Sequence, residues 1–384
     1  MPDGSDSLLA RTVSSIHDID AGVWNALANP APEKFNPFGA HEFLAALEES
    51  KSVSPEAGWA PMHLVIEDAG AITGVAPLYA KGHSQGEYIF DHHWADAYQR
   101  AGGAYYPKLL CAAPFTPVPG PRLLANDEAS KFNLALALRQ VAGSINASSA
   151  HINFIENADR SAAERAGYLT RMGEQFHWFN HGYDSFDDFL AVLSSRKRKA
   201  IRRERRDASA GLTIQRLQGN DITEAHWDAF WLFYQDTGAR KWGYPYLTRT
   251  FFRLIAERMS DALLLIVAER DGAPIAGALN FIGGDALYGR YWGCTVDVPF
   301  LHFELCYHQA VDFAIEHKLA RVEAGAQGQH KIARGYEPIA TWSAHWIPDE
   351  GFRTAIARYL EAERHETGRE IEALKYFTPF KKSF

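Results

Sequence analysis

The stretch of sequence most suggestive of chemistry is GAQGQHKIARGYEP, residues 325–338, where charged side chains follow a glycine-rich turn. It contains His330, Lys331, Arg334 and Tyr336. Side chains of these types can take a proton, stabilise a developing oxyanion and hold substrates in register. An exposed structural turn with solvated charges explains the same residues without any function.

Two further charged residues lie upstream of this block, in elements that we expect to be ordered. Glu304 begins the predicted helix ELCYHQAV and lies four residues before His308, so both would share one helical face. Glu304 could pair with that histidine, orient a substrate amine, or favour the helix N-terminus electrostatically. In LYGRYWG, alternation along a strand would point Arg290 and Tyr291 in opposite directions. A buried arginine there requires either a carboxylate partner or an anionic ligand.

A second chemical signal is the run RKRKAIRRERR, residues 196–206. Eight of its eleven residues are Lys or Arg and one is Glu, so the run carries +7 in a chain of net charge −8, and the remainder carries −15. Like charges four residues apart destabilise an isolated helix. The concentrated charge instead creates a positive field that attracts anions. We expect Lys199, Arg202 and Arg203 to bind phosphates without recognising a nucleotide sequence. The alternative is a purely solvated helix face.

The basic run is expected to belong to one helix over residues 190–209. Leu193, Ala200, Ile201 and Ala208 recur at spacings of seven or eight and would form a narrow apolar stripe. Gly211 is suited to end the helix. The expected partners of the exposed face are polyanions: a tRNA acceptor stem, the diphosphate of a nucleotide-linked precursor, or coenzyme A.

The first half of the chain offers a separate set of candidate substrate-binding residues. GHSQGEYIFDHHWADAY contains His83 and Glu87, and the segments YYPKLL and PFTPVPGPRLL contain Lys108 and Arg122 as isolated cations. The proline and aromatic residues around these cations suit a rigid substrate groove, or a packed loop. No metal site is expected, because neither HExxH nor CxxC occurs.

An internal repeat indicates which elements position these residues. HLVIEDAGAITGVAPLYAKG, residues 63–82, and LLLIVAERDGAPIAGALNFIGG, residues 263–284, both read as a strand, a tight turn and a second strand. Such turns need residues with positive φ. In each half a Pro-Phe loop, a helix and a short strand follow in the same order. We therefore predict a duplicated domain, with its two hairpins at equivalent sheet positions.

Length and composition agree with this organisation. A chain of 384 residues exceeds what one core usually supports, and we place the domains at 1–172 and 173–384. The predicted fold class is α/β (α+β), each domain being a mixed, largely antiparallel sheet flanked by helices. Neither GxGxxG after a strand nor GxxxxGK[ST] occurs, so a nucleotide-binding reading lacks support. Three cysteines, no secretory signal and no spanning apolar run predict a cytoplasmic protein.

Several segments resemble the FemAB-like branch of the GNAT acyltransferase superfamily, in particular its bacterial peptidoglycan biosynthesis or recognition subgroup. In the first half these are PLYAKGHSQGEYIFDHHWADAY and YYPKLLCAAPFTPVPGPRLL. In the second half they are FLAVLSSRKRKAIRRERRDASAG, DGAPIAGALNFIGGDALYGRYWG, HFELCYHQAVDFAIEHK and GAQGQHKIARGYEP. The resemblance covers nearly the whole chain. It implies two tandem GNAT-like domains, in agreement with the repeat.

The resemblance also implies a reaction: transfer of an acyl or aminoacyl group to an amine acceptor, with a peptidoglycan precursor as a possible acceptor. The donor would be acyl-CoA or aminoacyl-tRNA, and no tightly bound cofactor is expected. FemAB-type enzymes use a lysine in an aromatic-Lys motif to stabilise negative charge, and Lys331 is similar by its position. This sequence departs from that motif because His330, and not a purely apolar aromatic residue, precedes the lysine. His330 is therefore a candidate base. The alternative is a non-catalytic protein that binds a cell-wall or nucleotide-linked ligand.

Overall fold

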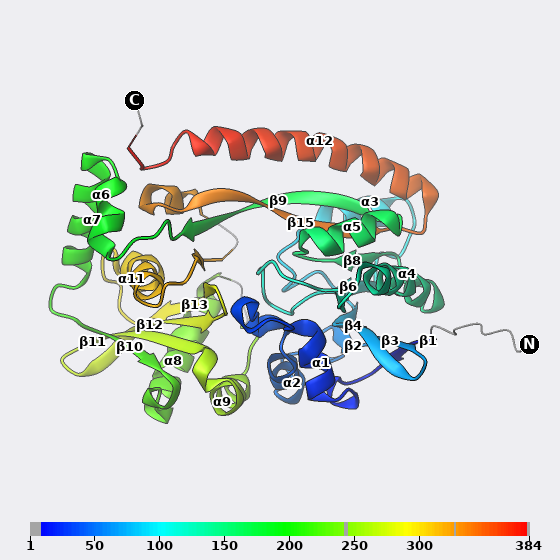
Figure 1. The fold of residues 1–384 in the computed structure, drawn as a ribbon, viewed down its shortest axis with the longest axis horizontal. Coiled ribbons are helices and arrows are strands. Elements are labelled where there is room, and N and C mark those ends of the chain that lie inside the picture. The colour runs from blue at the N-terminus through cyan, green and yellow to red at the C-terminus, as the bar shows by residue number, and fades with distance from the viewer. Residues whose placement is uncertain (1–8, 242–244, 326–327, 382–384) are drawn as a thin grey trace, which may run out of the picture. The chain divides into compact units, whose positions relative to one another are not determined.

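The computed structural model describes residues 9–241, 245–325 and 328–381 (Figure 1). Part of the N-terminal stretch that we examined for a targeting signal, and residues 326–327 of the GAQGQHK block, lie outside this part of the chain. The chain divides into two compact units. The first unit comprises residues 1–30, 38–173 and 340–369, and the second comprises residues 31–37, 174–339 and 370–384.

The first unit contains two sheets and the helices that cover them. One sheet has the strand order β1-β3-β4-β7, and the other contains β2, β5, β6, β8 and part of β15 as successive neighbours. The strands are β1 (Leu9–Val13), β2 (Trp59–Pro61), β3 (His63–Asp68), β4 (Ala71–Ala76), β5 (Leu78–Lys81), β6 (Lys108–Cys111), β7 (Leu124–Ala125), β8 (Ala150–Ile152) and β15 (Glu337–Trp346). The helices are α1 (Ala21–Ala28), α2 (His41–Glu49), α3 (His92–Arg100), α4 (Glu128–Ser144) and α5 (Asn157–Arg165).

The second unit is built on a sheet in the order β10-β11-β12-β13-β14-β9. Its strands are β9 (Leu169–Phe179), β10 (Thr213–Gln218), β11 (Leu263–Arg270), β12 (Ala273–Ile282), β13 (Ala286–Cys294) and β14 (Arg321–Glu323). Its helices are α6 (Phe186–Val192), α7 (Ser195–Ala208), α8 (Glu224–Lys241), α9 (Arg249–Arg258), α10 (Leu301–Phe303) and α11 (Gln309–Glu316). Within this unit, α11 lies on one face of the sheet and α8 and α9 lie on the other (Figure 1).

The two predicted hairpins form as expected, and their turns have the same local geometry. Ala69 and Gly70 have φ of 48° and 83°, and Asp271 and Gly272 have φ of 53° and 76°. Positive φ at both central positions is the signature of a type I′ turn. The strand register also shifts at equivalent places, between residues 66 and 67 and between residues 268 and 269. Each shift begins three residues before the first central turn residue.

The two hairpins differ in their sheets: β3 and β4 lie in the four-stranded sheet, apart from β6 and β8, whereas β11 and β12 lie in the same sheet as β13 and β14. The prediction of equivalent sheet positions is wrong in this respect. The parallel strand pairs do follow the same plan. In each unit one strand pair is parallel and is joined by a helical crossover: β6 and β8 through α4, and β13 and β14 through α10 and α11. An antiparallel strand from elsewhere in the chain then pairs with the last of these strands, β15 with β8 and β9 with β14. The expected fold class, two mixed units with largely antiparallel sheets and flanking helices, is confirmed.

The division of the chain differs from the single boundary that we predicted after residue 172. Residues 340–369, which include the second half of β15 and most of α12 (Glu350–Lys375), belong to the first unit. This assignment depends on β15 pairing with β8, where Ala344 lies opposite Ile152. A non-local strand pair of this kind leaves no composition shift in the sequence, so the sequence offered no sign of it.

The basic helix begins later than predicted. A separate helix, α6, ends at Val192, and α7 runs from Ser195 to Ala208. Leu193 is extended and forms a bridge with Phe380, which interrupts the helical path. Of the predicted apolar stripe, Leu193, Ile201 and Ala208 are buried and Ala200 is exposed. None of the helices in the described part of the chain combines the length and the apolar character needed to span a membrane.

Candidate active site

The candidate site of the second unit lies where two parallel strands separate. Strands β13 and β14 pair only from Ala286 to Tyr288 and from Arg321 to Glu323. Beyond the paired segment a cavity of about 100 Å³ opens between the strands and the helical crossover. Its lining residues are Ala278, Leu279, Asn280, Gly289, Arg290, Tyr291, Trp292, His302, Cys306, Tyr307 and Ala324. Crevices at the carboxyl ends of parallel strands are common ligand sites.

A β-bulge shapes the β13 wall of this cavity. Leu279 pairs with Tyr291, whereas the next residue, Asn280, pairs with Gly289. Arg290 is therefore the extra residue of the bulge, and strand alternation is interrupted there. The expectation that Arg290 and Tyr291 point to opposite faces is wrong for this reason, since both line the cavity. The Arg290 guanidinium lies 5.3 Å from the centre of the Tyr291 ring.

The opposite wall of the cavity comes from a turn of π-helix, Glu304–His308. This widened turn brings Cys306 and Tyr307 to the cavity, and π-helical turns occur often at functional sites. It also changes which side chains share a face. Gln309, five residues after Glu304, donates from Nε2 to Glu304 Oε1 over 2.8 Å.

The roles considered for Glu304 are corrected by its contacts. Its carboxylate is buried and accepts hydrogen bonds from Arg205 Nε and Nη2 at 3.2 and 3.1 Å. His308 instead lies 3.6 Å from Glu204. The predicted pairing of Glu304 with His308 assumed α-helical spacing, which the π-turn does not have. Because Glu304 is neutralised by an arginine and shielded from solvent, it is not placed to act on a substrate.

Lys331 lies in a 3₁₀ helix, Gln329–Arg334, that is bounded by two glycines with positive φ, Gly328 and Gly335. Lys331 is only 1 % exposed, contrary to the expected exposed turn, whereas the preceding residues Gln329 and His330 are exposed. The ammonium group donates to the Gly325 carbonyl at 2.8 Å. Burial lowers the pKa of Lys331 from 10.5 to about 7, and the nearby Cys306 partly opposes this shift.

His330 contacts the cavity through Tyr307. The Tyr307 hydroxyl lies 2.9 Å from His330 Nε2. Burial, together with the positive charges of Arg334 and Lys331, lowers the pKa of His330 below its usual value of 6.5. Burial raises the pKa of Tyr307. Because the neutral imidazole of His330 is hydrogen-bonded to the protonated phenol of Tyr307, Tyr307 can give its proton to His330 while it accepts one from a group in the cavity.

Arg334 and Tyr336 are not available to an external anion. Arg334 donates from Nε and Nη2 to the two oxygens of Glu204 at 3.1 and 3.0 Å, and its guanidinium lies 3.4 Å from the Phe303 ring centre. Tyr336 is fully buried, with its ring 5.5 Å from that of Tyr307. Glu204, the only acidic residue of the basic run, thus holds the 3₁₀ helix that carries His330 and Lys331.

The three cations of the basic helix α7 that we expected to bind phosphates differ in their contacts. Arg202 pairs with Asp187 at 2.8 Å and Arg203 pairs with Asp207 at 3.2 Å, both at the surface. Lys199 is exposed and has no carboxylate partner among the residues that the structure describes. The predicted phosphate-binding set therefore contains one unpaired cation and two that already contact carboxylates. An open hollow of about 350 Å³ beside α6 and α7 is lined by Arg202, Arg205 and Asp187, with Ser185, Phe186 and Leu190.

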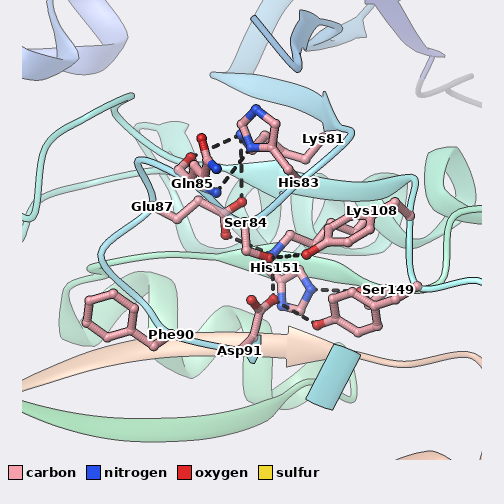
Figure 2. Close-up of polar contacts among 12 residues, drawn as sticks. Lys81, His83, Ser84, Gln85, Glu87, Phe90, Asp91, Lys108, Ser149 and His151 are labelled. Carbon is pink, nitrogen blue, oxygen red and sulfur yellow. Dashed lines mark hydrogen bonds and ion pairs between the residues drawn. The ribbon is translucent and has the colours of Figure 1, made fainter. Parts of the chain in front are cut away.

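Two of the polar residues predicted in the first half, Glu87 and Lys108, belong to a buried cluster in the first unit (Figure 2). Lys108 Nζ donates to Ser84 Oγ and Glu87 Oε2, both at 2.8 Å, and to Asp91 Oδ2. Lys108 is therefore not an isolated cation. Burial alone would lower its pKa, but the carboxylates of Glu87 and Asp91 raise it above the usual value. Lys81 lies 3.8 Å from Glu87 and 3.5 Å from the Trp59 ring centre.

His83 and Arg122 have mainly structural contacts. His83 Nε2 lies 3.0 Å from the Ala57 carbonyl, and its Nδ1 accepts from the Gln85 amide at 3.1 Å. Arg122 is buried and donates to the carbonyls of Val118 and Pro121. The packed-loop alternative fits these contacts, and the described contacts of Lys108 and Arg122 leave no open groove around either cation.

Sequence reasoning missed two histidines beside this cluster. His151 and His345 lie opposite each other on β8 and β15, with their Nδ1 atoms 2.6 Å apart. Ser149 Oγ and Ser343 Oγ lie 2.7 and 2.9 Å from the two Nε2 atoms. Burial lowers the pKa of His151 to about 3 and that of His345 well below 6.5. The repeated triplet Ser-Ala-His, at residues 149–151 and 343–345, was a signal that could have found them.

Several solved structures are similar to this chain over most of its length. At 13 % identity the chain is similar to the crystal structure of FemX, with a TM-score of 0.55 over 88 % of this chain and 98 % of FemX. It is similar at 10 % identity to the C-terminal domain of a putative lysylphosphatidylglycerol synthetase from Agrobacterium fabrum, with a TM-score of 0.55 over 90 % and 97 % of the two chains. A tandem GNAT protein from the clavulanic acid biosynthesis pathway matches at 13 % identity and a TM-score of 0.47, over 90 % of this chain and all of its own.

At these identities the likenesses to FemX and to the synthetase domain show a shared fold. No curated protein matches the sequence. The family described as FemAB-like, peptidoglycan biosynthesis/recognition, matches residues 15–382. That match extends over both units, the cavity between β13 and β14, and the basic helix. This protein therefore belongs to the FemAB-like family.

Proposed function

We propose that the protein transfers an acyl or aminoacyl group to an amine acceptor, and that the reaction takes place in the cavity between β13 and β14. The observation that carries this proposal is the set of groups around one cavity: Tyr307 in its wall, His330 bonded to Tyr307, and Lys331 held in the adjoining 3₁₀ helix. These supply a proton path and a cation beside a space that a small acyl group could enter.

The proposed proton path begins at the acceptor. Its amine loses a proton as it attacks the donor carbonyl, and the Tyr307 hydroxyl accepts that proton while giving its own to His330 Nε2. His330 is suited to this role because its lowered pKa keeps the imidazole neutral near pH 7. The tyrosine acts as a relay and not as a free base, since burial raises its pKa. The tetrahedral intermediate then collapses and expels the donor's alkoxide or thiolate, which receives the proton back from His330 through Tyr307 and leaves as the alcohol or thiol.

Lys331 would stabilise the negative charge that develops on the carbonyl oxygen. A cation in a buried site is effective in this role, because it is poorly shielded by water. In the free protein its pKa of about 7 leaves the ammonium partly deprotonated. The developing oxyanion favours the protonated form, so charge stabilisation is strongest in the transition state, which is where binding energy accelerates a reaction.

The chemistry of the site admits two donor classes, a coenzyme A thioester and an aminoacyl ester of tRNA. The family, with its peptidoglycan description, supports a cell-wall precursor as the amine acceptor, and the similarity to FemX agrees with this choice. We place the reaction in the cytoplasm, where both donors are made. Neither donor is a tightly bound cofactor in this proposal.

The proposal is tested by incubating the purified protein with acetyl-CoA or aminoacyl-tRNA and a panel of peptidoglycan precursors that carry a free amine. We expect release of free coenzyme A or deacylated tRNA that depends on the acceptor. The variant Tyr307→Phe should lose the relay and slow release by about a hundredfold, whereas Tyr359→Phe, at an exposed tyrosine, should have no effect. Saturable binding of a precursor without product would favour the non-catalytic alternative.

A further inference from the structure

Two neighbouring aromatic residues at the end of α12 are unusually exposed. Tyr376 is 84 % and Phe377 is 69 % exposed, the highest values among the large hydrophobic residues that the structure describes. Their amides bond back to Ala373 and Leu374, so both belong to an ordered final turn. Singly exposed apolar side chains are common on protein surfaces, but an adjacent pair of this size is a feature of interaction sites.

The segment after these aromatics is fixed beside the start of α7. The Pro379 carbonyl accepts from the Ser194 amide at 2.8 Å, and the Lys381 amide donates to the Val192 carbonyl at 3.0 Å. Phe380 packs against the hydrophobic core of the second unit. Figure 1 shows the end of α12 next to α6 and α7. Tyr376 and Phe377 therefore point outward from a segment that is held in place.

Unpaired cations lie close to the same segment. Arg196, Lys197 and Lys199 in the first half of α7, and Lys381 after α12, have no carboxylate partner in the described part of the chain. The cations that do have partners, Arg202, Arg203, Arg205 and Arg206, all lie in the second half of α7. Positive side chains near a helix N-terminus add to the positive end of the helix dipole, which is unfavourable for the helix. The arrangement therefore favours an external anion.

We propose that Tyr376 and Phe377, together with Arg196, Lys197, Lys199 and Lys381, form a surface that binds the second unit to an anionic lipid bilayer. Aromatic rings enter the headgroup region of a bilayer, and neighbouring cations contact its acidic lipids. The charge of the surface complements such a bilayer, and its two adjacent rings would be removed from water on binding. A nucleic-acid duplex presents its phosphates to the cations but would leave the Phe377 ring exposed, which favours lipid over duplex nucleic acid.

This inference is independent of the proposed transfer reaction, because vesicle binding is measured without turnover. The full chain is sedimented with vesicles of phosphatidylcholine alone and of phosphatidylcholine mixed with phosphatidylglycerol. We expect binding only to the mixed vesicles and a loss of binding as salt rises, since exposed charges are screened. Failure to sediment with the mixed vesicles at low salt would overturn the proposal.

Two variants separate the two parts of the surface. Tyr376→Ser/Phe377→Ser and Arg196→Gln/Lys197→Gln/Lys199→Gln should each weaken partitioning by at least about tenfold. Matched controls alter exposed residues elsewhere: Leu232→Ser, at a side chain 59 % exposed, and Lys34→Gln/Arg270→Gln/Lys318→Gln, at three exposed cations of the same unit. Both controls should bind as the unmodified protein does. Equal losses in the controls would overturn the proposal.

A competition experiment distinguishes the lipid surface from a nucleic-acid site. Single-stranded RNA is added to the protein and the mixed vesicles, because bases can stack on exposed aromatic rings. We expect RNA to leave the vesicle-bound fraction largely unchanged. If RNA binds more tightly and the Tyr376→Ser/Phe377→Ser variant loses that binding, the surface is a nucleic-acid site and the proposal is wrong. Should the double variant fold poorly by circular dichroism, Tyr376→Ser alone replaces it, since that side chain is almost fully exposed.

Discussion

At the scale of single residues, a distinctive property of the second unit is a buried lysine with a strongly lowered pKa, a property that Lys81 of the first unit shares. Lys331 has 1 % of its surface exposed, and its ammonium donates to one backbone carbonyl. Removing an ammonium from water disfavours its charged form, which explains the pKa of about 7. Such groups are concentrated at functional sites. Burial of Lys331 thus lowers the folding stability, and the proposed chemistry would explain why such a residue is present.

The pH dependence of the transfer rate should reflect the titration of both Lys331 and His330. Above a pH of about 7 Lys331 loses its proton, so the stabilisation of the oxyanion and the rate should fall as pH rises. Below the lowered pKa of His330 the imidazole is protonated and cannot accept a proton, so the rate should also fall at acid pH. We therefore expect a bell-shaped profile of kcat/KM.

The variant Lys331→Arg provides the control for this profile. Arginine stays protonated at all pH values of the assay, so the loss of rate on the alkaline side should disappear even if the overall rate is lower. An alkaline limb that is unchanged in Lys331→Arg would contradict the assignment of that limb to Lys331.

The lowered pKa of Lys331 should also affect the free energy of unfolding, which can be measured without an assay of function. Since the folded pKa of about 7 lies below 10.5, the unfolded state binds more protons between these values, and the free energy of unfolding rises with pH across that window. Lys331→Met removes this penalty and should raise the free energy of unfolding at pH 7 by about 1–3 kcal/mol. Urea unfolding at pH 7 and near pH 10 should show a smaller gain at the higher pH, and an equal gain would refute the explanation.

At the scale of elements, the organising contact is that of α7 with the 3₁₀ helix Gln329–Arg334. Glu204 accepts two hydrogen bonds from Arg334, and Arg205 binds both Glu304 and Asp312. These pairs fasten the basic helix to the π-turn and to the 3₁₀ helix that carries His330 and Lys331. Glu204 is a positioning residue in this arrangement, because it contacts neither the cavity nor a substrate.

Loss of this contact should affect catalysis more than folding. Glu204→Gln keeps the shape of the side chain but weakens its bonds to Arg334, and a shift of the 3₁₀ helix by about 1 Å can slow a reaction by about a hundredfold. We expect kcat to fall with little change in KM, and hydrogen exchange to quicken in residues 329–334. The exchanged pair Glu204→Arg/Arg334→Glu should recover part of the rate. A variant with unchanged kcat and unchanged exchange would show that the contact is dispensable.

The buried cluster of the first unit has a different energetic consequence. Lys108 forms ion pairs with Glu87 and Asp91, and all three side chains are buried. Lys108→Met would remove this shared cation and leave Lys81 as a more distant partner, 3.8 Å from Glu87. Removal of one partner from a buried ion pair costs about 3–5 kcal/mol. We expect a fall of this size in the free energy of unfolding, whereas Lys318→Met, at an exposed lysine, should change it by less than about 0.5 kcal/mol. A similar small effect at Lys108 would mean that water reaches the cluster.

At the scale of the whole molecule, the two units share a plan and differ in the use of their polar residues. Both contain a type I′ hairpin, a bulge at the same distance from its turn, and a parallel strand pair with a helical crossover. In the second unit the parallel pair borders a cavity with ionisable groups nearby. In the first unit Lys108 instead donates hydrogen bonds to Glu87 and Asp91 within a buried cluster. A duplicated scaffold can keep its fold while the site diverges.

The sequence by itself determined the local features of this protein. Asp271-Gly272 predicts a tight turn because these residue types tolerate positive φ, and the basic run predicts an exposed helix because its apolar residues form only a narrow stripe. The block that contains His330 and Lys331 was also recognisable. The tertiary structure alone decided the burial of Lys331, the β-bulge at Arg290, the partners of Glu304 and Lys108, and the return of residues 340–369 to the first unit. Burial, register and ion pairing depend on residues far apart in the chain, and no local pattern specifies them.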